Sequence, residues 1–288
     1  MDNKVLIIGA YGLLGTALSS FLSKNGFNVL RSGRKEFSEI NLDALDINSL
    51  ENNINNLKPD YIINLAAITD VDFCESNKIE AFSINTDIPK NISKLKNKYS
   101  YRFIHISTDQ VYHGNGPHKE SETNPINIYS KSKLKGEDFV LENGGVILRT
   151  NFVGKSKNKE RKSFTDWLFE NAKNNKKFSL FSDVNFNPVH INDLCEIISV
   201  IAKDFQTGCF NLGSRGKITK AEFGIIFLKN LKFDTSSIRI CSVKESYLKA
   251  NRPFDMTMDV SKISKNFNKH LPTIKETIDK CIKEYKIQ

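Results

Sequence analysis

Tyr129 and Lys133 are the residues with the clearest chemical potential, because they lie four positions apart in the run Tyr-Ser-Lys-Ser-Lys. Residues at this spacing share one face of a helix, one turn apart. An ammonium beside a phenol lowers the phenol pKa from about 10, so that a proton can be exchanged near neutral pH. The spacing also occurs by chance on many solvated helices. Together with a glycine-rich turn at 9–15 and Ser-Thr-Asp at 107–109, it predicts a nucleotide-dependent enzyme that moves a hydride and a proton.

Three glycines stand between an apolar run at 4–9 and a helical pattern at 13–24. Glycine lets the backbone turn sharply and approach a pyrophosphate, whose charge the N-terminus of the following helix stabilises. Their spacing of three and three differs from the tighter Gly-x-Gly-x-x-Gly of ordinary dinucleotide domains. The residues expected to bind the cofactor at this turn are Gly9, Tyr11, Gly12, Leu13, Leu14 and Gly15.

Arg31 and Arg34 follow the second expected strand, where an acidic residue would bind the adenosine ribose of NAD. Two guanidiniums suit the 2′-phosphate of NADP instead. The same arginines also fit ordinary solvated loop charges, so the pattern favours NADP(H) and leaves NAD(H) open. Asp46 and Ile47, at the expected end of the third strand, are predicted to hold the adenine.

Short apolar runs alternate with helical patterns in the first half of the chain. Such runs are typical of strands buried in a parallel sheet, and the alternation requires right-handed crossovers. We therefore predict an α/β fold, a doubly wound parallel (Rossmann) sheet, with a smaller, mainly helical substrate-binding lobe. The expected domains are 1–152 for dinucleotide binding, to which later segments return, and 153–288 for most of the lobe. Helices are expected at 81–98 and 164–173, and the third strand is expected to end near Leu45–Asp46.

Composition argues against several classes of function. Lys and Arg number 42 against 33 Asp and Glu, a net charge of +9 that helps to attract nucleotide phosphates. The basic residues are neither gathered in an arm nor interleaved with aromatic residues, so no nucleic-acid partner is expected. No apolar run reaches the roughly 18 residues that span a bilayer, and no signal peptide is visible, so we expect a cytoplasmic protein without a membrane partner. The five cysteines and five histidines form no metal-ligand pattern, which predicts free thiols and no metal.

Five motifs in order make the chain resemble the extended short-chain dehydrogenase/reductase family. They are Gly-x-x-Gly-x-x-Gly at 9–15, Asn-Leu-Ala-Ala-Ile-Thr at 64–69, Ser-Thr-Asp-Gln-Val-Tyr at 107–112, Tyr-x-x-x-Lys at 129–133 and Arg-Thr at 149–150. Within that family, almost the whole chain is most similar to dTDP-4-dehydrorhamnose reductase and its relatives. The resemblance implies NAD(P)H-dependent reduction of a 4-keto-6-deoxy nucleotide sugar, which would be the substrate. Because the family is often dimeric, it also implies that a homodimer can form.

The resemblance further implies a role for each residue of the expected site. Tyr129 would donate a proton to the substrate oxygen with help from the Thr108 hydroxyl, and Lys133 would bind the nicotinamide ribose and keep Tyr129 acidic. Asp109 and Phe152 would lie beside the sugar. The other cofactor contacts that it implies, several of them small residues forming the floor, are Ile106, Ala66, Ala67 and Thr69.

Two departures from the family pattern bear on the reaction. Gln110 stands where nucleotide-sugar dehydratases have the glutamate that removes a proton, and an uncharged amide has no useful basicity. Dehydration is therefore not expected. Phe152 stands where the reductases usually have a tryptophan, so the sugar is not specified. Two alternatives stay open, a nucleotide-sugar epimerase with tightly bound NAD and a non-catalytic regulatory relative.

Overall fold

A parallel sheet forms the centre of the computed structural model, which describes residues 3–34, 37–158 and 160–286. Within these ranges the sheet has seven strands in the order β11-β6-β5-β4-β1-β2-β3, and all neighbours are parallel. The strands are β1 (Lys4–Ile8), β2 (Asn28–Gly33), β3 (Ile40–Asn41), β4 (Tyr61–Asn64), β5 (Arg102–Thr108), β6 (Val146–Thr150) and β11 (Gly208–Leu212). Because the order reverses between β1 and β4, the carboxyl ends of these strands flank the crevice in which such sheets bind ligands.

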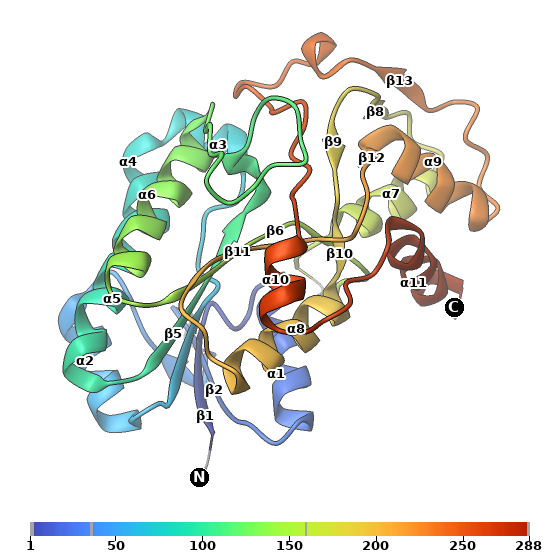
Figure 1. The fold of residues 1–288 in the computed structure, drawn as a ribbon. Helices are drawn as coiled ribbons and strands as arrows, with labels where there is room; N and C mark the ends of the chain where they lie inside the picture. Colours follow the sequence, from blue (N-terminus) through green and yellow to red (C-terminus); the bar gives the residue numbers. More distant parts are fainter. Residues whose placement is uncertain (1–2, 35–36, 159, 287–288) are drawn as a thin grey trace.

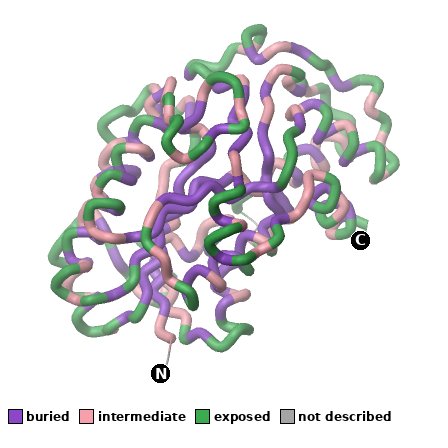
Figure 2. Tube along the Cα trace, in the orientation of Figure 1, coloured by how far each residue is buried: buried purple, intermediate pink, exposed green. Residues whose placement is uncertain are grey.

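Helices cover both faces of this sheet (Figure 1). They are α1 (Leu13–Lys24), α2 (Ile47–Leu57), α3 (Val71–Ser76), α4 (Lys78–Phe82), α5 (Ile88–Tyr99), α6 (Ile128–Glu142), α8 (Ile191–Lys203) and α10 (Ser261–Asn266). Successive side chains of a strand point to opposite faces. Accordingly, Val5 and Ile7 of β1 join a core with α1 and α8, whereas Leu6 and Ile8 join a core with α2 and α5. Figure 2 shows the strands as the buried centre of the molecule.

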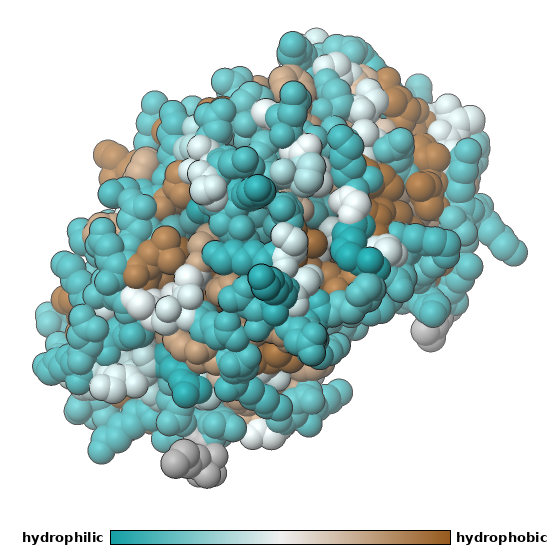
Figure 3. All heavy atoms as spheres, in the orientation of Figure 1, coloured by the Kyte–Doolittle hydropathy of each residue, from teal (hydrophilic) through white to brown (hydrophobic). Residues whose placement is uncertain are grey.

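A smaller lobe, built from the second half of the chain, lies at the upper right of Figure 1. Its elements are β7 (Phe152–Val153), α7 (Phe164–Lys173), β8 (Ser179–Phe181), β9 (Asn185–Phe186), β10 (Val189–His190), β12 (Ile218–Thr219), α9 (Lys220–Asn230), β13 (Arg239–Cys241) and α11 (Ile274–Lys286). Its core is rich in phenylalanine, since Phe186, Phe223 and Phe227 are fully buried there. Short ladders accompany its helices, as β9 pairs with β12 and β8 with β13. Apolar atoms also gather on its surface (Figure 3).

The predicted fold class is confirmed, because the central sheet is parallel and doubly wound. From beyond residue 152, strand β11 and helix α8 return to this sheet and its core. The division at residue 152 stays a prediction. The expected helix at 164–173 is found with those bounds.

Two predicted elements were wrong in detail. The third strand, β3, ends at Asn41 rather than near Leu45–Asp46. The reason is that Asp46 caps helix α2, where its carboxylate accepts the N–H of Asn48 at 2.9 Å. The expected helix at 81–98 is interrupted by a π-helical turn, η1 (Ser83–Asp87).

The five cysteines are all buried free thiols. Among the described residues, none of the helices combines the length and the apolar character needed to cross a bilayer.

Candidate active site

The glycine-rich turn between β1 and α1 forms a cradle with no room for side chains. Gly9 has φ +87°, and a Cβ placed on it would lie 2.9 Å from the backbone nitrogen of Ala66. A Cβ on Gly15 would lie 2.3 Å from the carbonyl oxygen of Gly9. The lobe also reaches this turn, since Asn158 Nδ2 donates to the carbonyl oxygen of Tyr11 at 2.6 Å. The turn therefore needs glycine at both positions because backbone packs against backbone there, and it leads directly into the N-terminus of α1.

Arg31 lies on strand β2 itself rather than after it. Its guanidinium stacks over the Tyr11 ring, 4.5 Å from the centroid, and Nη1 is 3.3 Å from Glu39 Oε1. The Tyr11 hydroxyl in turn accepts the backbone N–H of Glu39 at 2.7 Å. Within the described part of the chain, Arg31 Nε is buried without a hydrogen-bond partner. A buried N–H of this kind is suited to an anionic ligand oxygen.

The other residues predicted at the adenine end lie close to a hollow of about 790 Å³. Arg34 is exposed and lines it together with Leu45 and Ile84. Asp46 and Ile47 form the start of α2, so the Asp46 carboxylate is already engaged in capping. Their contact with an adenine stays a prediction.

Helix α6 carries both Tyr129 and Lys133, and its start is held in place from several directions. The Asn127 side chain accepts the Ser130 N–H at 2.8 Å and donates to the Asn251 carbonyl at 2.9 Å. The Glu75 carboxylate of α3 accepts the N–H of Ile128 at 3.0 Å. These contacts satisfy backbone donors that a helix start leaves open. Tyr129, in the first turn, is thereby oriented with little freedom.

Tyr129 is 7 % exposed and packs among Val71, Cys74 and Ala81. Burial raises the pKa of Tyr129, and a hydrogen bond with the Thr108 hydroxyl lowers it only in part. The expectation that Lys133 holds this phenol at a low pKa was therefore wrong for the cofactor-free protein. The physical reason is that desolvation opposes the charged phenolate, while the Lys133 side chain is directed to other groups.

Lys133 is 2 % exposed, one turn after Tyr129. Its Nζ donates to the carbonyl oxygen of Ile106 at 2.7 Å and lies 3.2 Å from His105 Nε2. Burial lowers the pKa of Lys133 to about 8, and the charge of Glu137 opposes that shift. Lys133 can therefore gain or lose a proton close to neutral pH.

Glu137 and Arg149 fix the rest of α6 against the sheet. Both are nearly fully buried, and Arg149 Nη2 lies 2.6 Å from Glu137 Oε2. Arg149 Nη1 also donates to the Tyr112 hydroxyl at 2.7 Å, and Ser107 donates to Glu137. The Arg-Thr motif thus has a positioning role, because a bidentate ion pair between β6 and α6 holds the helix that carries Lys133.

Asp109 follows β5 and joins the two lobes. It is 2 % exposed and accepts a hydrogen bond from Asn151 Nδ2 at 2.7 Å and one from Thr108 Oγ1 at 3.3 Å. Burial raises the pKa of Asp109 to about 6, while the charge of Lys220 opposes this. Lys220, from the start of α9, has its Nζ 3.7 Å from the ring centre of Phe186. Burial lowers the Lys220 pKa to about 8, so the two groups carry opposite charges between pH 6 and 8.

The loop after β4 is fastened to α6 through the π-helical turn. Asn85, in that turn, exchanges hydrogen bonds with the backbone of Ile68 at 2.9 and 3.1 Å and donates to Ser132 Oγ at 3.0 Å. π-helical turns are often found at functional sites. The predicted cofactor residues of this loop are partly buried except for the exposed Thr69, and they are Ala66, Ala67 and Thr69.

Phe152 is half-buried in β7, directly after Asn151, and packs against the core of the sheet. Its contact with a sugar stays a prediction. Gln110 follows Asp109, and its side-chain oxygen accepts from Asn127 Nδ2 at 3.5 Å. The Gln110 amide therefore supports the start of α6.

Sequence patterns missed four residues of this site. Asn64 ends β4 and begins the motif at 64–69, which was the available signal. His105 lies within β5 and outside the quoted motifs. Asn151 adjoins the Arg-Thr motif. Lys220 gave no signal, because its relation to Asp109 arises from the approach of the lobe.

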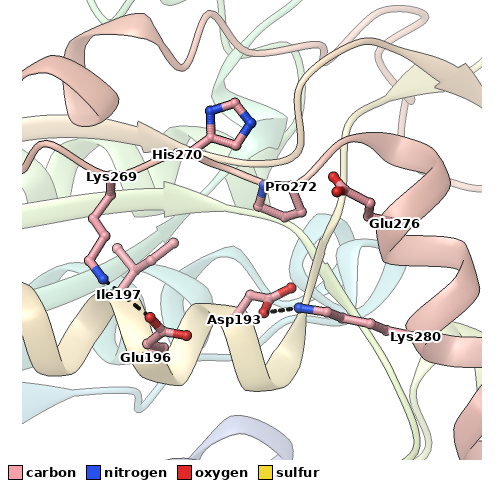
Figure 4. Close-up of a pocket in the computed structure, with 8 residues that line it drawn as sticks. All are labelled: Asp193, Glu196, Ile197, Lys269, His270, Pro272, Glu276 and Lys280. Carbon is pink, nitrogen blue, oxygen red and sulfur yellow. Dashed lines mark hydrogen bonds and ion pairs between the residues drawn. The ribbon is translucent and has the colours of Figure 1, made fainter.

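A second hollow, of about 270 Å³, lies between α8 and α11 (Figure 4). Its charged side chains pair with one another, Lys280 with Asp193 and Lys269 with Glu196. None of the predicted site residues lines it. Among the described residues, no cluster of three or more His, Cys, Asp or Glu side chains could hold a metal ion.

Comparison with known proteins yields close matches in sequence and in structure. The family model described as RmlD substrate binding domain matches residues 3–287. The dTDP-4-dehydrorhamnose reductase of Aggregatibacter actinomycetemcomitans is 31% identical, covering 71% of this chain and 69% of that protein. Methionine adenosyltransferase 2 subunit beta of Pongo abelii is 28% identical, covering 91% of this chain and 82% of that protein. The crystal structure of dTDP-4-dehydrorhamnose reductase from Bacillus anthracis in complex with NADP superposes with a TM-score of 0.89 at 26% identity, covering 99% of this chain and 100% of that chain.

Proposed function

Because the chain belongs to the RmlD substrate binding domain family, we propose that it is an NAD(P)H-dependent reductase of a 4-keto-6-deoxy nucleotide sugar, with Tyr129 as proton donor. The observation that carries this proposal is that Tyr129, in the first turn of α6, is buried beside the carboxyl end of β5, where the Thr108 hydroxyl acts on its pKa. A phenol and a hydroxyl so placed can act together on the oxygen of a ketone. The related reductases of this family support the choice of substrate class.

The residues at the other end of the crevice fit a dinucleotide. Gly9 and Gly15 allow the turn after β1 to pack directly against neighbouring backbone, and the N-terminus of α1 that follows the turn would stabilise a pyrophosphate. The unpartnered Nε–H of Arg31 suits a 2′-phosphate, which favours NADPH over NADH. The NADP in the related Bacillus anthracis structure points the same way. When bound, the nicotinamide supplies the hydride.

This chain's own residues would handle the proton. As charge develops on the ketone oxygen, the Tyr129 O–H bond breaks and a new O–H bond forms on the substrate, while Thr108 donates to the same oxygen. Asn151 holds the Asp109 carboxylate at 2.7 Å, so that it accepts from a sugar hydroxyl without moving. Lys220, at the start of α9 in the lobe, offers the matching donor.

We predict that the protein reduces a ketone that another enzyme has made and does not make that ketone itself. One tube contains protein, NADP⁺ and an intact nucleotide hexose, and others contain NADPH with each of a panel of 4-keto-6-deoxy nucleotide sugars. We expect no keto-deoxy product in the first and NADPH oxidation in at least one of the others, because Gln110 lacks the basicity to remove a carbon-bound proton.

The same assay separates the alternatives. Keto-deoxy product in the first tube without NADPH oxidation in the others would contradict the reductase assignment. Cofactor that stays bound after desalting and interconverts sugars without net oxidation would indicate an epimerase. The similarity to methionine adenosyltransferase 2 subunit beta favours the regulatory alternative, which would be indicated by inactivity on the whole panel.

Lys220→Met should raise the KM for the sugar substrate about 10-fold or more, because a hydrogen bond to a charged group contributes about 1.5–3 kcal/mol. The dissociation constant of NADPH should stay unchanged. The matched control is Lys217→Met, because Lys217 is an exposed lysine in the same segment as Lys220. The Lys217 Nζ lies 3.7 Å from Asp255 Oδ2. Steady-state kinetics with a sugar that the wild-type protein reduces measure the KM of both variants. Equal KM values for the two variants would remove Lys220 from substrate binding.

A further inference from the structure

A buried series of hydrogen bonds leads from the loop after β4 to Lys133. Asn64 and His105 are register partners on β4 and β5, and both are fully buried. Asn64 Oδ1 accepts the backbone N–H of Ala66 at 3.0 Å, and Asn64 Nδ2 lies 3.1 Å from His105 Nδ1. On the other side of the ring, His105 Nε2 lies 3.2 Å from Lys133 Nζ. Each of these contacts has a direction that can be assigned.

The direction is set at Ala66, whose N–H can only donate. Asn64 Oδ1 is therefore the acceptor, and the amide NH₂ of Asn64 faces the imidazole. That NH₂ has no lone pair to offer, so His105 Nδ1 must accept. A neutral imidazole that accepts at Nδ1 carries its proton on Nε2. The His105 Nε2–H group thus points at Lys133 Nζ.

The protonation state of Lys133 follows from that direction. An ammonium has three N–H donors and no acceptor, so a charged Lys133 would set a donor against the Nε2–H of His105. An uncharged amine accepts that hydrogen with its lone pair. It still donates to the Ile106 carbonyl oxygen at 2.7 Å. The uncharged amine therefore satisfies every partner in this buried network.

We propose that Asn64 and His105 are positioning residues for Lys133: Asn64 sets the His105 tautomer, and His105 then stabilises the uncharged amine. Its kinetic consequence rests on the proposed function, whereas the tautomer does not. The ammonium reaches the uncharged form when an Nζ–H bond breaks and the proton passes to solvent water. A solvent proton then returns the ammonium. By stabilising the amine, His105 lowers the pH at which Lys133 loses its charge.

The electrostatic surroundings agree with this assignment. Burial holds the pKa of His105 well below its usual range, and a charge on Lys133 would lower it further, so the ring stays neutral in either state of Lys133. Burial lowers the pKa of Lys133, and Glu137 is the charged group that opposes this. Titratable and charged groups of α6 and of the elements packed around it include Tyr129, Glu137, His105, Asp109, Arg149, Glu75 and Asp87.

The tautomer can be measured directly by ¹⁵N NMR of the imidazole nitrogens in the full-length, cofactor-free protein. The chain has five histidines, and His105→Phe identifies the signals of this ring. We expect the spectrum of a neutral ring with its proton on Nε2 throughout the pH range in which the protein is folded. A proton on Nδ1, or a charged ring at neutral pH, would overturn the proposal without any variant of Asn64.

Asn64→Asp should invert the network. A carboxylate can only accept, so His105 would carry its proton on Nδ1 and present a lone pair to Lys133. The ammonium would then be favoured. Under the proposed function, a charged Lys133 on the same helix favours the phenolate that Tyr129 becomes when it donates its proton, so the pH at which kcat falls on the alkaline side should rise by about one unit or more. The pH dependence of kcat is measured with a sugar that the wild-type protein reduces.

Asn85→Asp is the matched control, because Asn85 is equally buried and bonds to Ser132 of α6 rather than to His105. It adds a similar charge near the helix and should leave the His105 tautomer unchanged. A ring that keeps its proton on Nε2 in Asn64→Asp, or a tautomer change of equal size in Asn85→Asp, would contradict the proposal. Absence of turnover with every sugar would contradict the proposed function, and the NMR result would still decide the present inference.

Discussion

Replacing Tyr129 by phenylalanine is expected to lower kcat by about 10²–10⁴-fold, the usual cost of losing a general acid. The substitution removes the hydroxyl and keeps the ring, which packs among Val71, Cys74, Ala81 and Ala250. Folding and cofactor binding should therefore persist. Turnover is measured by NADPH oxidation with a reactive 4-keto sugar, and cofactor binding by fluorescence titration.

Tyr61→Phe is the matched control for this substitution. Tyr61 is 6 % exposed, and its hydroxyl accepts from Arg102 Nη1 at 3.0 Å. It begins β4 and so lies at the end of the sheet opposite to the site. We expect wild-type kcat in Tyr61→Phe. Wild-type kcat in Tyr129→Phe would remove Tyr129 from the mechanism.

Arg31→Ala is expected to weaken NADPH binding about 10- to 150-fold, the equivalent of one charge-assisted hydrogen bond of about 1.5–3 kcal/mol. The dissociation constant of NADH should change little, because NADH has no 2′-phosphate for the buried Nε–H of Arg31 to meet. Titration of the purified protein with each cofactor measures the two constants.

Arg239→Ala provides the comparison for nonspecific loss of charge. Arg239, on strand β13 of the lobe, forms an ion pair with Glu245 at 2.9 Å. Arg31, on strand β2, forms a similar ion pair with Glu39. Arg239→Ala should leave both cofactor constants unchanged. Equal weakening of NADPH and NADH in Arg31→Ala would show that Arg31 supports the crevice without recognising the 2′-phosphate.

Local patterns were sufficient to predict the class of fold and the ends of the strands at which the site lies. The run at 4–8 and the glycines after it form a strand and a turn for reasons contained in a few neighbouring residues, namely apolar burial and the space that a Cβ would need. The helical spacing of Tyr129 and Lys133 is equally local, and both residues lie on α6 as expected. Sequence by itself therefore determined the backbone segments that carry the glycine turn and the Tyr129–Lys133 pair.

Tertiary structure decided the electrostatics of that site and its partners. The Tyr129 pKa rises because several elements exclude water from the phenol, and the helical spacing contains no information about that exclusion. His105 contacts Lys133 because β5 packs against α6, and the charge of Lys220 acts on Asp109 because α9 belongs to the lobe that adjoins the sheet. Desolvation and contacts between distant segments depend on the complete packing of the chain. For that reason the sequence identified the residue pair, whereas the folded molecule set the charge that each residue carries.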